Sequence, residues 1–245
     1  MRLVDRVKHI GNAINSMIDR GLTSSGLNQP TSISSQEDSM RLLDRVKYIL
    51  LTPKTEWATI KSEQTTPVKL LLDYVAILAL IPAVATIIGR SLIGMPVRPM
   101  GTIPVPIGFS IGAGVFRYLS AFAIAYGVAF LANELAPSFG GQKNLNMALK
   151  VVVYSLTPMW IVGIFEIIPP LSILILLGFY GSYLLYLGLP ALMGVSKDTV
   201  TGYLVIIIVV TIIVVLLLRT LEGIIVAEGM DYGLPHDIWY YFRNP

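Results

Sequence analysis

The chain has 245 residues, of which 54% are hydrophobic and 13% are charged, and its formal net charge is +3. Water-soluble domains usually carry about 25% charged residues, so this composition excludes an ordinary soluble protein and indicates an integral membrane protein. The chain has no cysteine, which excludes disulfides and thiolate chemistry, and its small positive charge gives no reason to expect a nucleic-acid partner.

The first 69 residues are polar and basic and hold 10 of the 18 lysines and arginines. They contain an internal repeat, because residues 1–10 and residues 40–49 are identical at eight of ten positions. We expect residues 1–39 to form an N-terminal extension. Its segment 23–39 is rich in serine, threonine and other polar residues, which is typical of a mobile linker.

Residues 40–69 are predicted to form short cytoplasmic amphipathic helices. In the second repeat copy, the apolar residues follow helical spacing and the basic residues lie mostly on the other side. A second helix is expected to begin near Pro53, because Thr52 suits an N-cap and proline is tolerated in the first helical turn. Trp57 suits an interfacial anchor. These helices either lie in the lipid headgroups or pack on the ends of the membrane helices.

Residues 70–221 are mostly apolar and are predicted to form the membrane domain. A helix needs about 20 apolar residues to cross roughly 30 Å of hydrocarbon. Five segments meet this requirement: 70–89, 115–135, 148–167, 170–190 and 201–221. The predicted fold is therefore an all-α polytopic bundle of five transmembrane helices. Residues 222–245 form a C-terminal tail, in which the aromatic run 238–242 is expected to anchor at the membrane surface.

The stretch 91–114, between the first two predicted spans, is rich in proline and glycine. It is either an ordinary outer loop or a re-entrant element, which is tolerated at depth only when it is buried in protein or lines water. The spacing of Gly108 and Gly112 fits a close helix contact.

Proline positions define the predicted turn between the third and fourth spans. Pro169 and Pro170 fit the start of a helix, where the missing N–H removes no internal hydrogen bond, so residues 148–190 are predicted to form a tight transmembrane hairpin. Pro158 lies within the third span and predicts a bend, which serves either as a packing kink or as a functional hinge. The candidate structural positions are Pro158, Pro169, Pro170, Gly188 and Pro190.

The distribution of lysine and arginine predicts the orientation of the chain. With five spans, the N-terminal region and the second and fourth loops share one side, which holds thirteen of these residues, against five on the other side. Positive charge favours the cytoplasmic side. We therefore expect the N-terminus in the cytoplasm and the C-terminus outside.

Several ionisable or polar side chains fall within or beside the predicted spans. They are Asp73, Arg117, Glu134 and Glu166, together with Tyr180, Tyr183 and Tyr186. A charge at mid-span costs about 2.5–3.5 kcal/mol and is a functional candidate, but all four charged residues are predicted near an interface. The three tyrosines form one stripe on the fourth span. Such a stripe serves either interhelical packing and hydrogen bonding or a lipid or small-molecule groove.

Three stretches of the chain carry a family resemblance: LAPSFGGQKNLNMALKVVVYSLTPMWIVGIF at 135–165, IIPPLSILILLGFYGSYLLYLGLPALM at 167–193 and RLLDRVKYILLTPKTEW at 41–57. Together they resemble the prokaryotic branch of the Yip family, whose eukaryotic members are membrane partners of Rab-type GTPases. The resemblance covers roughly residues 40–221. It implies a five-span helical membrane domain with a cytoplasmic N-terminus, which we expect in a prokaryotic cytoplasmic (inner) membrane.

The expected function is that of a non-catalytic membrane adaptor or scaffold. It would offer a cytoplasmic surface to a membrane or cytoplasmic protein partner, within a larger complex, or would organise the bilayer. The distinctive helix ends and loops gather on the predicted cytoplasmic side. The candidate partner-binding residues are Arg41, Arg45, Lys47, Trp57, Pro137, Phe139, Gly140, Gly141, Gln142, Lys143, Asn144 and Lys197.

The sequence offers little support for catalysis. Its two histidines, His9 and His236, lie in opposite terminal segments, so no histidine-based metal or catalytic cluster is expected in the spans. We expect no cofactor. The alternative function is a small-solute or ion transporter or channel, or an accessory subunit of one. It would use Asp73, Glu134, Glu166 or Arg117.

Overall fold

The structure, a computed structural model, describes residues 31–97, 101–103 and 105–231. The chain divides into two compact units, Met1–Leu43 and Asp44–Pro245. Helix α2, Thr31–Leu51, belongs partly to each unit and includes the second half of the predicted linker. The first repeat copy and the aromatic run of the tail lie outside the described residues.

The second unit is a bundle of membrane-length helices. Within the described residues, five helices are long and apolar enough to cross a membrane: Pro67–Ile93, Ile107–Phe139, Leu145–Ile167, Leu176–Met193 and Val200–Ile225. Each overlaps one of the five predicted spans, so the predicted all-α polytopic bundle is confirmed. The chain is a multi-pass membrane protein.

Most spans are built from several consecutive helical pieces. The first comprises α4 (Pro67–Leu70), η1 (Leu71–Val75), α5 (Ala76–Leu78), α6 (Leu80–Ile88) and η2 (Gly89–Ile93). The second comprises α7 (Ile107–Leu135) and η3 (Ala136–Phe139), and the third α8 (Leu145–Val162) and η4 (Gly163–Ile167). The fourth comprises η5 (Pro169–Phe179) and α9 (Tyr180–Met193), and the fifth is α10 (Val200–Asp231). The short helix α3 (Pro53–Ser62) precedes them all.

A short β-hairpin joins the first two spans. Strands β1 (Met95–Val97) and β2 (Gly101–Ile103) pair antiparallel. Helix α7 then begins at Ile107, eight residues before the predicted start of the second span at residue 115. A hairpin followed by a helix extension fits the outer-loop interpretation of this stretch.

The glycine spacing in this stretch does not produce the expected helix contact. A Cβ atom on Gly108 or Gly112 would meet nothing within 4 Å, whereas one on Gly114 would lie 2.4 Å from the Ile87 side chain. The close approach between the first two spans therefore occurs at Gly114.

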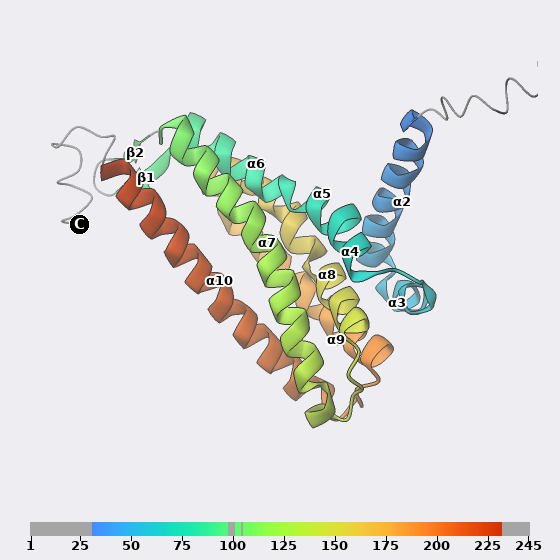
Figure 1. Cartoon of the computed structure of the whole chain (residues 1–245). Coiled ribbons are helices and arrows are strands. Elements are labelled where there is room, and N and C mark those ends of the chain that lie inside the picture. Colours follow the sequence, from blue (N-terminus) through green and yellow to red (C-terminus); the bar gives the residue numbers. More distant parts are fainter. Residues whose placement is uncertain (1–30, 98–100, 104, 232–245) are drawn as a thin grey trace, which may run out of the picture. The chain divides into compact units, whose positions relative to one another are not determined.

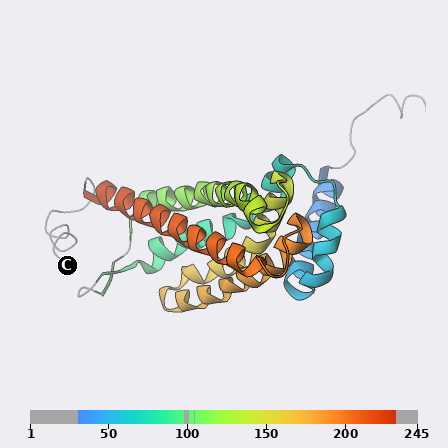
Figure 2. The same cartoon turned by 90° about the horizontal axis from the view of Figure 1, so that it is seen from below.

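Helix α8 lies at the centre of the bundle, and α10 lies at its periphery. In the most apolar stretch of each span, 67% of the residues are buried in the third span and 6% in the fifth. Helix α8 packs against α7 and α9, whereas α10 rests on α7 and α9. In Figures 1 and 2, α10 (red) runs along the outside of the bundle with α7 (green) beside it.

The chain reverses direction at Ile168, between the two 3-10 helices η4 and η5. Helix η5 and the following α9 both pack against α8, so the third and fourth spans form the predicted hairpin. Helix α8 continues through Pro158, and the neighbouring Thr157 hydroxyl lies 2.8 Å from the Tyr74 hydroxyl of the first span. A hydrogen bond thus joins the first and third spans beside the proline.

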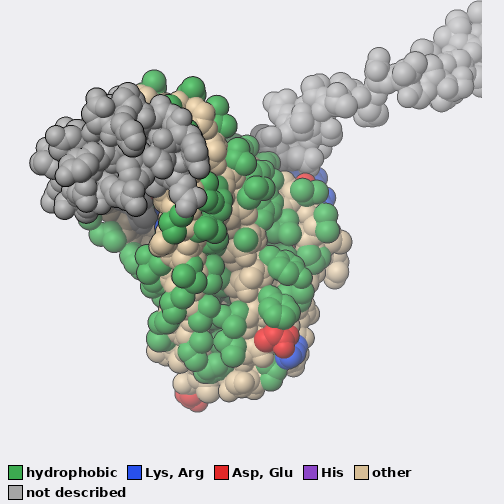
Figure 3. Space-filling model, turned by 60° about the vertical axis from the view of Figure 1, so that its left-hand side comes forward, with side chains coloured by type: hydrophobic (Ala, Val, Ile, Leu, Met, Phe, Trp, Pro, Cys, Tyr) green, Lys and Arg blue, Asp and Glu red, His purple; other side chains and the backbone are tan. Residues whose placement is uncertain are grey.

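The two ends of the bundle differ in character. At one end, called here the hairpin end, β1 and β2 lie near the last turns of α10 (Figure 1). At the other end, called here the α3 end, α3 lies near the beginning of α8, and η3 lies near the beginning of α10. Between them, hydrophobic side chains cover most of the described face in Figure 3, as expected for a surface in contact with lipid.

Candidate functional site

Five charged side chains from four elements meet at the hairpin end. This hairpin-end charge cluster consists of Arg90 from η2, Arg117 from α7, Glu166 from η4, and Arg219 and Glu222 from α10. The Oε1 atom of Glu166 accepts hydrogen bonds from Arg117 and, at 3.0 Å, from Arg219. Arg90 Nη2 lies 2.6 Å from Glu222 Oε1. These ion pairs connect the first, second, third and fifth spans.

Most of this cluster is withdrawn from the surface. The side chains of Glu222, Glu166 and Arg117 are 4%, 13% and 16% exposed. Thr86 donates a hydrogen bond of 3.1 Å to the second oxygen of Glu166. The Nη1 atom of Arg117 is buried and has no hydrogen-bond partner among the described residues. Three arginines face two glutamates, so the cluster carries an excess positive charge.

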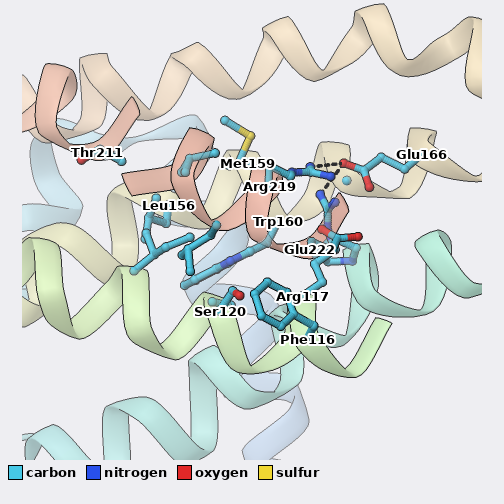
Figure 4. Close-up of a pocket in the computed structure, with 16 residues that line it drawn as sticks. Phe116, Arg117, Ser120, Leu156, Met159, Trp160, Glu166, Thr211, Arg219 and Glu222 are labelled. Atoms are coloured by element: carbon cyan, nitrogen blue, oxygen red, sulfur yellow. Dashed lines mark hydrogen bonds and ion pairs between the residues drawn. The ribbon is translucent and has the colours of Figure 1, made fainter. Parts of the chain in front are cut away.

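A cavity of about 150 Å³ begins at this cluster and continues into the bundle between α7, α8 and α10. Figure 4 shows Arg117, Glu166 and Glu222 at one end, whereas Leu156 and Thr211 lie toward the other. The remaining wall is mostly apolar, and its largest side chains are Phe116, Trp160 and Met159. The cavity is thus charged at one end and hydrophobic along its length.

A second cavity, of about 110 Å³, continues under α10 toward the fourth span. Leu156, Met159 and Thr211 line both cavities. Met159, which lines both cavities, is 41% exposed. Because Met159 lies within a membrane span, an opening of the cavities at this residue would face the surrounding lipid.

At the opposite end, α3 is attached to the bundle by buried side chains. Lys150 of α8 is fully buried and donates hydrogen bonds to the carbonyl oxygens of Ile60 at 3.0 Å and Glu63 at 2.6 Å. Trp57 is 1% exposed and packs on Gly188, where a Cβ atom would lie 2.8 Å from the indole ring. Trp57 is therefore an internal anchor, and α3 packs on the membrane helices, as the second of the two predicted arrangements requires.

Arg45, at the end of α2, also turns inward. It forms ion pairs with Glu56 and Glu63, and its guanidinium lies 5.6 Å from the centre of the Tyr154 ring. Burial lowers the pKa of Arg45, but the acidic groups of Tyr154, Glu63 and Glu56 outweigh this effect and raise the pKa above its ordinary value. Arg45 therefore stays charged and fixes the α2–α3 corner, whereas Lys47 is exposed. Arg41 is exposed and belongs to the other unit.

The remaining predicted partner-binding residues come together in two loops at the α3 end. We call residues 137–144 and 194–198 the loop pair. The backbone N–H of Gln142 donates to the Met193 carbonyl at 2.9 Å, and the Thr199 hydroxyl donates to the Phe139 carbonyl at 2.8 Å. The Phe139 ring also stacks on Tyr203, with 4.8 Å between ring centres. These contacts hold the loop pair as one surface.

Glycine allows this loop geometry. Gly140 and Gly194 have φ angles of 73° and 70°, in the left-handed region that favours glycine. A Cβ atom on Gly141 would lie 2.9 Å from Val195, so the two loops approach as closely as glycine permits. Asn144 caps α8 by accepting a hydrogen bond of 3.1 Å from the Met147 N–H.

The loop pair presents polar and basic groups to solvent. Its exposed members include Pro137, Gln142, Lys143 and Lys197. The Nζ atom of Lys143 lies 2.5 Å from Glu134 Oε2. Glu134, at the end of the second span, is therefore part of a surface ion pair.

The other residues singled out from the sequence have separate environments. Asp73 is exposed and lies 3.9 Å from Lys69, one helical turn away. Tyr180 donates a hydrogen bond of 2.9 Å to the Leu50 carbonyl, while Tyr183 and Tyr186 are exposed on the same helix. Helix η5 begins at Pro169, and α9 continues through Pro190. Of the four charged candidates within the spans, only Arg117 and Glu166 are brought together.

Sequence reasoning did not identify Arg90, Arg219 and Glu222 as site residues. Each lies at or near the end of a span, where a charge is unremarkable by itself. One signal was available in the sequence: several spans have a charged residue near the same end of the bundle, and these charges include both signs. Among the described residues, no group of three or more His, Cys, Asp or Glu side chains is placed to hold a metal ion.

Comparison with known proteins identified one family. The Yip1 domain matches residues 47–218, which is more than two thirds of the chain. No curated protein and no solved structure matched the chain. The matched range begins in α2 and includes α3, the loop pair and nearly all of the five spans.

Proposed function

The chain belongs to the Yip1 domain family, and we propose that it acts as a non-catalytic membrane adaptor whose loop pair binds a protein partner on the cytoplasmic side. The observation that carries this proposal is the fixed geometry of the two loops. Hydrogen bonds from Gln142 and Thr199 join segments about 50 residues apart into one exposed surface. A surface that is already ordered loses little conformational entropy on binding.

The chemistry of the loop pair indicates the kind of partner. Lys197 is exposed and makes none of the ion pairs found among the described residues. Gln142 and its neighbours add hydrogen-bonding groups at the tip of the turn. The surface therefore suits a polar protein face that carries acidic side chains, which would associate faster at low ionic strength.

The distribution of charge supports an adaptor over a transporter. The hairpin-end charge cluster lies at one end of the bundle, and Glu134 lies at the other, in a surface ion pair with Lys143. The cavities between these ends are lined mostly by apolar side chains. A path for ions would need polar groups or water along its length.

Site-specific photo-crosslinking in native membranes tests the proposal. A photo-reactive residue at position 142 should capture one partner in stoichiometric amount. The same residue at the exposed position 54 on α3, also at the α3 end, should not. Gly141→Val should reduce capture from position 142, because the added side chain would meet Val195 and separate the loops.

Two outcomes would contradict adaptor function. One is equal capture of many proteins from both positions. The other is solute movement in liposomes by the purified protein alone, if Glu134→Gln or Asp73→Asn abolished it. The second result would establish transport instead.

A further inference from the structure

We propose that the two cavities under α10 bind one phospholipid with an anionic headgroup, whose phosphate is held by Arg219 and Arg117 and whose acyl chain lies along the apolar walls. This lipid would be a specific ligand rather than part of the surrounding bilayer. The proposal rests on the depth of the charges, the composition of the walls, the exposure of Met159 and the charge balance of the cluster.

The positions of the arginines along α7 and α10 fit the depth of lipid headgroups. From the helical rise, Arg117 is about 27 Å from Leu135 along α7, and Arg219 is about 28 Å from Val200 along α10. These lengths match the roughly 30 Å hydrocarbon thickness of a bilayer. With Leu135 and Val200 taken as one edge of the hydrocarbon, the hairpin-end charge cluster lies at the opposite edge, within reach of lipid headgroups, whereas Thr211 lies about 12 Å deeper along α10.

The cavity walls suit an acyl chain below the phosphate. The walls next to the charges are formed by Phe116, Trp160 and Leu156, and the second cavity continues the apolar path. A small soluble anion would leave this apolar length unfilled. Met159 lines both cavities and is 41% exposed, and an opening there would give a lipid a sideways route from the bilayer.

The charge balance favours an anionic headgroup. Glu166 is shared by two arginines through the same oxygen, while Glu222 pairs with Arg90. One positive charge is therefore in excess, and Arg117 Nη1 has no hydrogen-bond partner among the described residues. An arginine fork matches the oxygens of a phosphate in geometry and charge. A bound phosphate would supply the missing negative charge, and Arg219, which is 44% exposed and lines the cavity, is accessible to it.

Native mass spectrometry of the full chain released from nanodiscs tests this proposal. The nanodiscs would contain equal amounts of phosphatidylglycerol and phosphatidylcholine. We expect one retained phosphatidylglycerol per protein. Arg219→Gln should lower its retention about tenfold, the loss expected for a hydrogen bond to a charged group. Lys54→Gln removes one exposed positive charge from α3, at the other end of the bundle, and should leave retention unchanged.

A second variant separates the acyl chain from the headgroup. Ser120→Phe fills the cavity without altering any charge and should also reduce retention, with thermal unfolding measured to show that each variant is folded. Addition of free glycerol 3-phosphate distinguishes a lipid from a soluble anion. Equal retention of the two lipids, equal effects of Arg219→Gln and Lys54→Gln, no effect of Ser120→Phe, or displacement by millimolar glycerol 3-phosphate would each overturn the proposal.

Discussion

Lys150 shows how a single buried side chain can connect a short helix to the membrane domain. Its ammonium group donates to the Ile60 and Glu63 carbonyls, which lie at the C-terminal end of α3 and have no further helical turn to bond them. In the sequence, Lys150 is recognisable only as a positive charge near the predicted cytoplasmic side. Its role depends on α3 folding back onto α8.

Replacing Lys150 with methionine should loosen this connection. The change keeps much of the side-chain volume but leaves two carbonyls without their donor, which should cost about 1–3 kcal/mol in the free energy of unfolding. Hydrogen–deuterium exchange should rise over residues 60–66. Lys143→Met, which removes an exposed lysine, is the matched control. Unchanged exchange in Lys150→Met would show that the contact does not hold α3.

Gly188 is a second residue whose importance depends on packing. Gly188→Ala places a methyl group against the Trp57 ring, and overpacking of this kind typically costs about 1–3 kcal/mol. The melting temperature should fall. It should recover in part when Trp57→Leu is added, because the smaller side chain makes room for the methyl group.

Gly127→Ala is the control for Gly188→Ala. A Cβ atom at position 127 meets nothing within 4 Å, and alanine is the better helix former, so stability should hold or rise. Independent, additive effects of Gly188→Ala and Trp57→Leu would contradict a direct contact between these two residues.

At the scale of elements, α10 is the span with the least support from the rest of the bundle. Only 6% of the residues in its most apolar stretch are buried, so we expect its ion pairs at the hairpin end to contribute to its attachment beside the packing of Tyr203 and Ile207. Glu166→Gln would leave Arg117 without its charge partner. Removing one partner of a buried ion pair costs about 3 kcal/mol or more in the free energy of unfolding.

We therefore expect Glu166→Gln to lower the melting temperature and to increase proteolytic cleavage near the end of α10. Glu134→Gln removes a carboxylate from an exposed ion pair and should cost about 1 kcal/mol or less. Thermal unfolding in detergent compares the two variants. Equal losses would show that the hairpin-end charge cluster adds no more stability than a surface pair.

The elements themselves could largely be predicted from the sequence, because the length of apolar stretches is set by the bilayer. The five spans follow from this rule, and the turn at Pro169 follows from the rule together with the position of the prolines. The early start of α7 at Ile107 could not be predicted, because residues 107–114 are too rich in glycine to read as helix. They are helical because they pack on the first span, where Gly114 contacts Ile87.

The candidate sites could be predicted only in part. Each loop of the loop pair was singled out because its unusual residues are close together in sequence, but the hydrogen bonds that join the two loops could not be predicted. The hairpin-end charge cluster joins Arg90, Arg117, Glu166 and Arg219 from four spans, and no local pattern shows which spans are neighbours. Trp57 was expected at the membrane interface. Its burial against Gly188 could not be predicted, because it depends on how α3 packs on the membrane helices.

At the scale of the whole molecule, the five spans place the loop pair and the β-hairpin at opposite ends of the bundle (Figure 1). The proposed function requires the loop pair to face the cytoplasm. In this orientation, thirteen of the eighteen lysines and arginines lie on the cytoplasmic side, as the positive-inside rule favours. The proposed lipid would in that case belong to the outer leaflet.

Labelling of single cysteines tests this arrangement directly, since the natural chain has no cysteine. Gln142→Cys lies in the loop pair and Thr102→Cys in β2, and both positions are exposed. In intact cells of a bacterial expression host, an impermeant maleimide should label Thr102→Cys and should reach Gln142→Cys only after the membrane is opened. Labelling of both positions in intact cells, or of Gln142→Cys alone, would contradict a cytoplasmic partner surface.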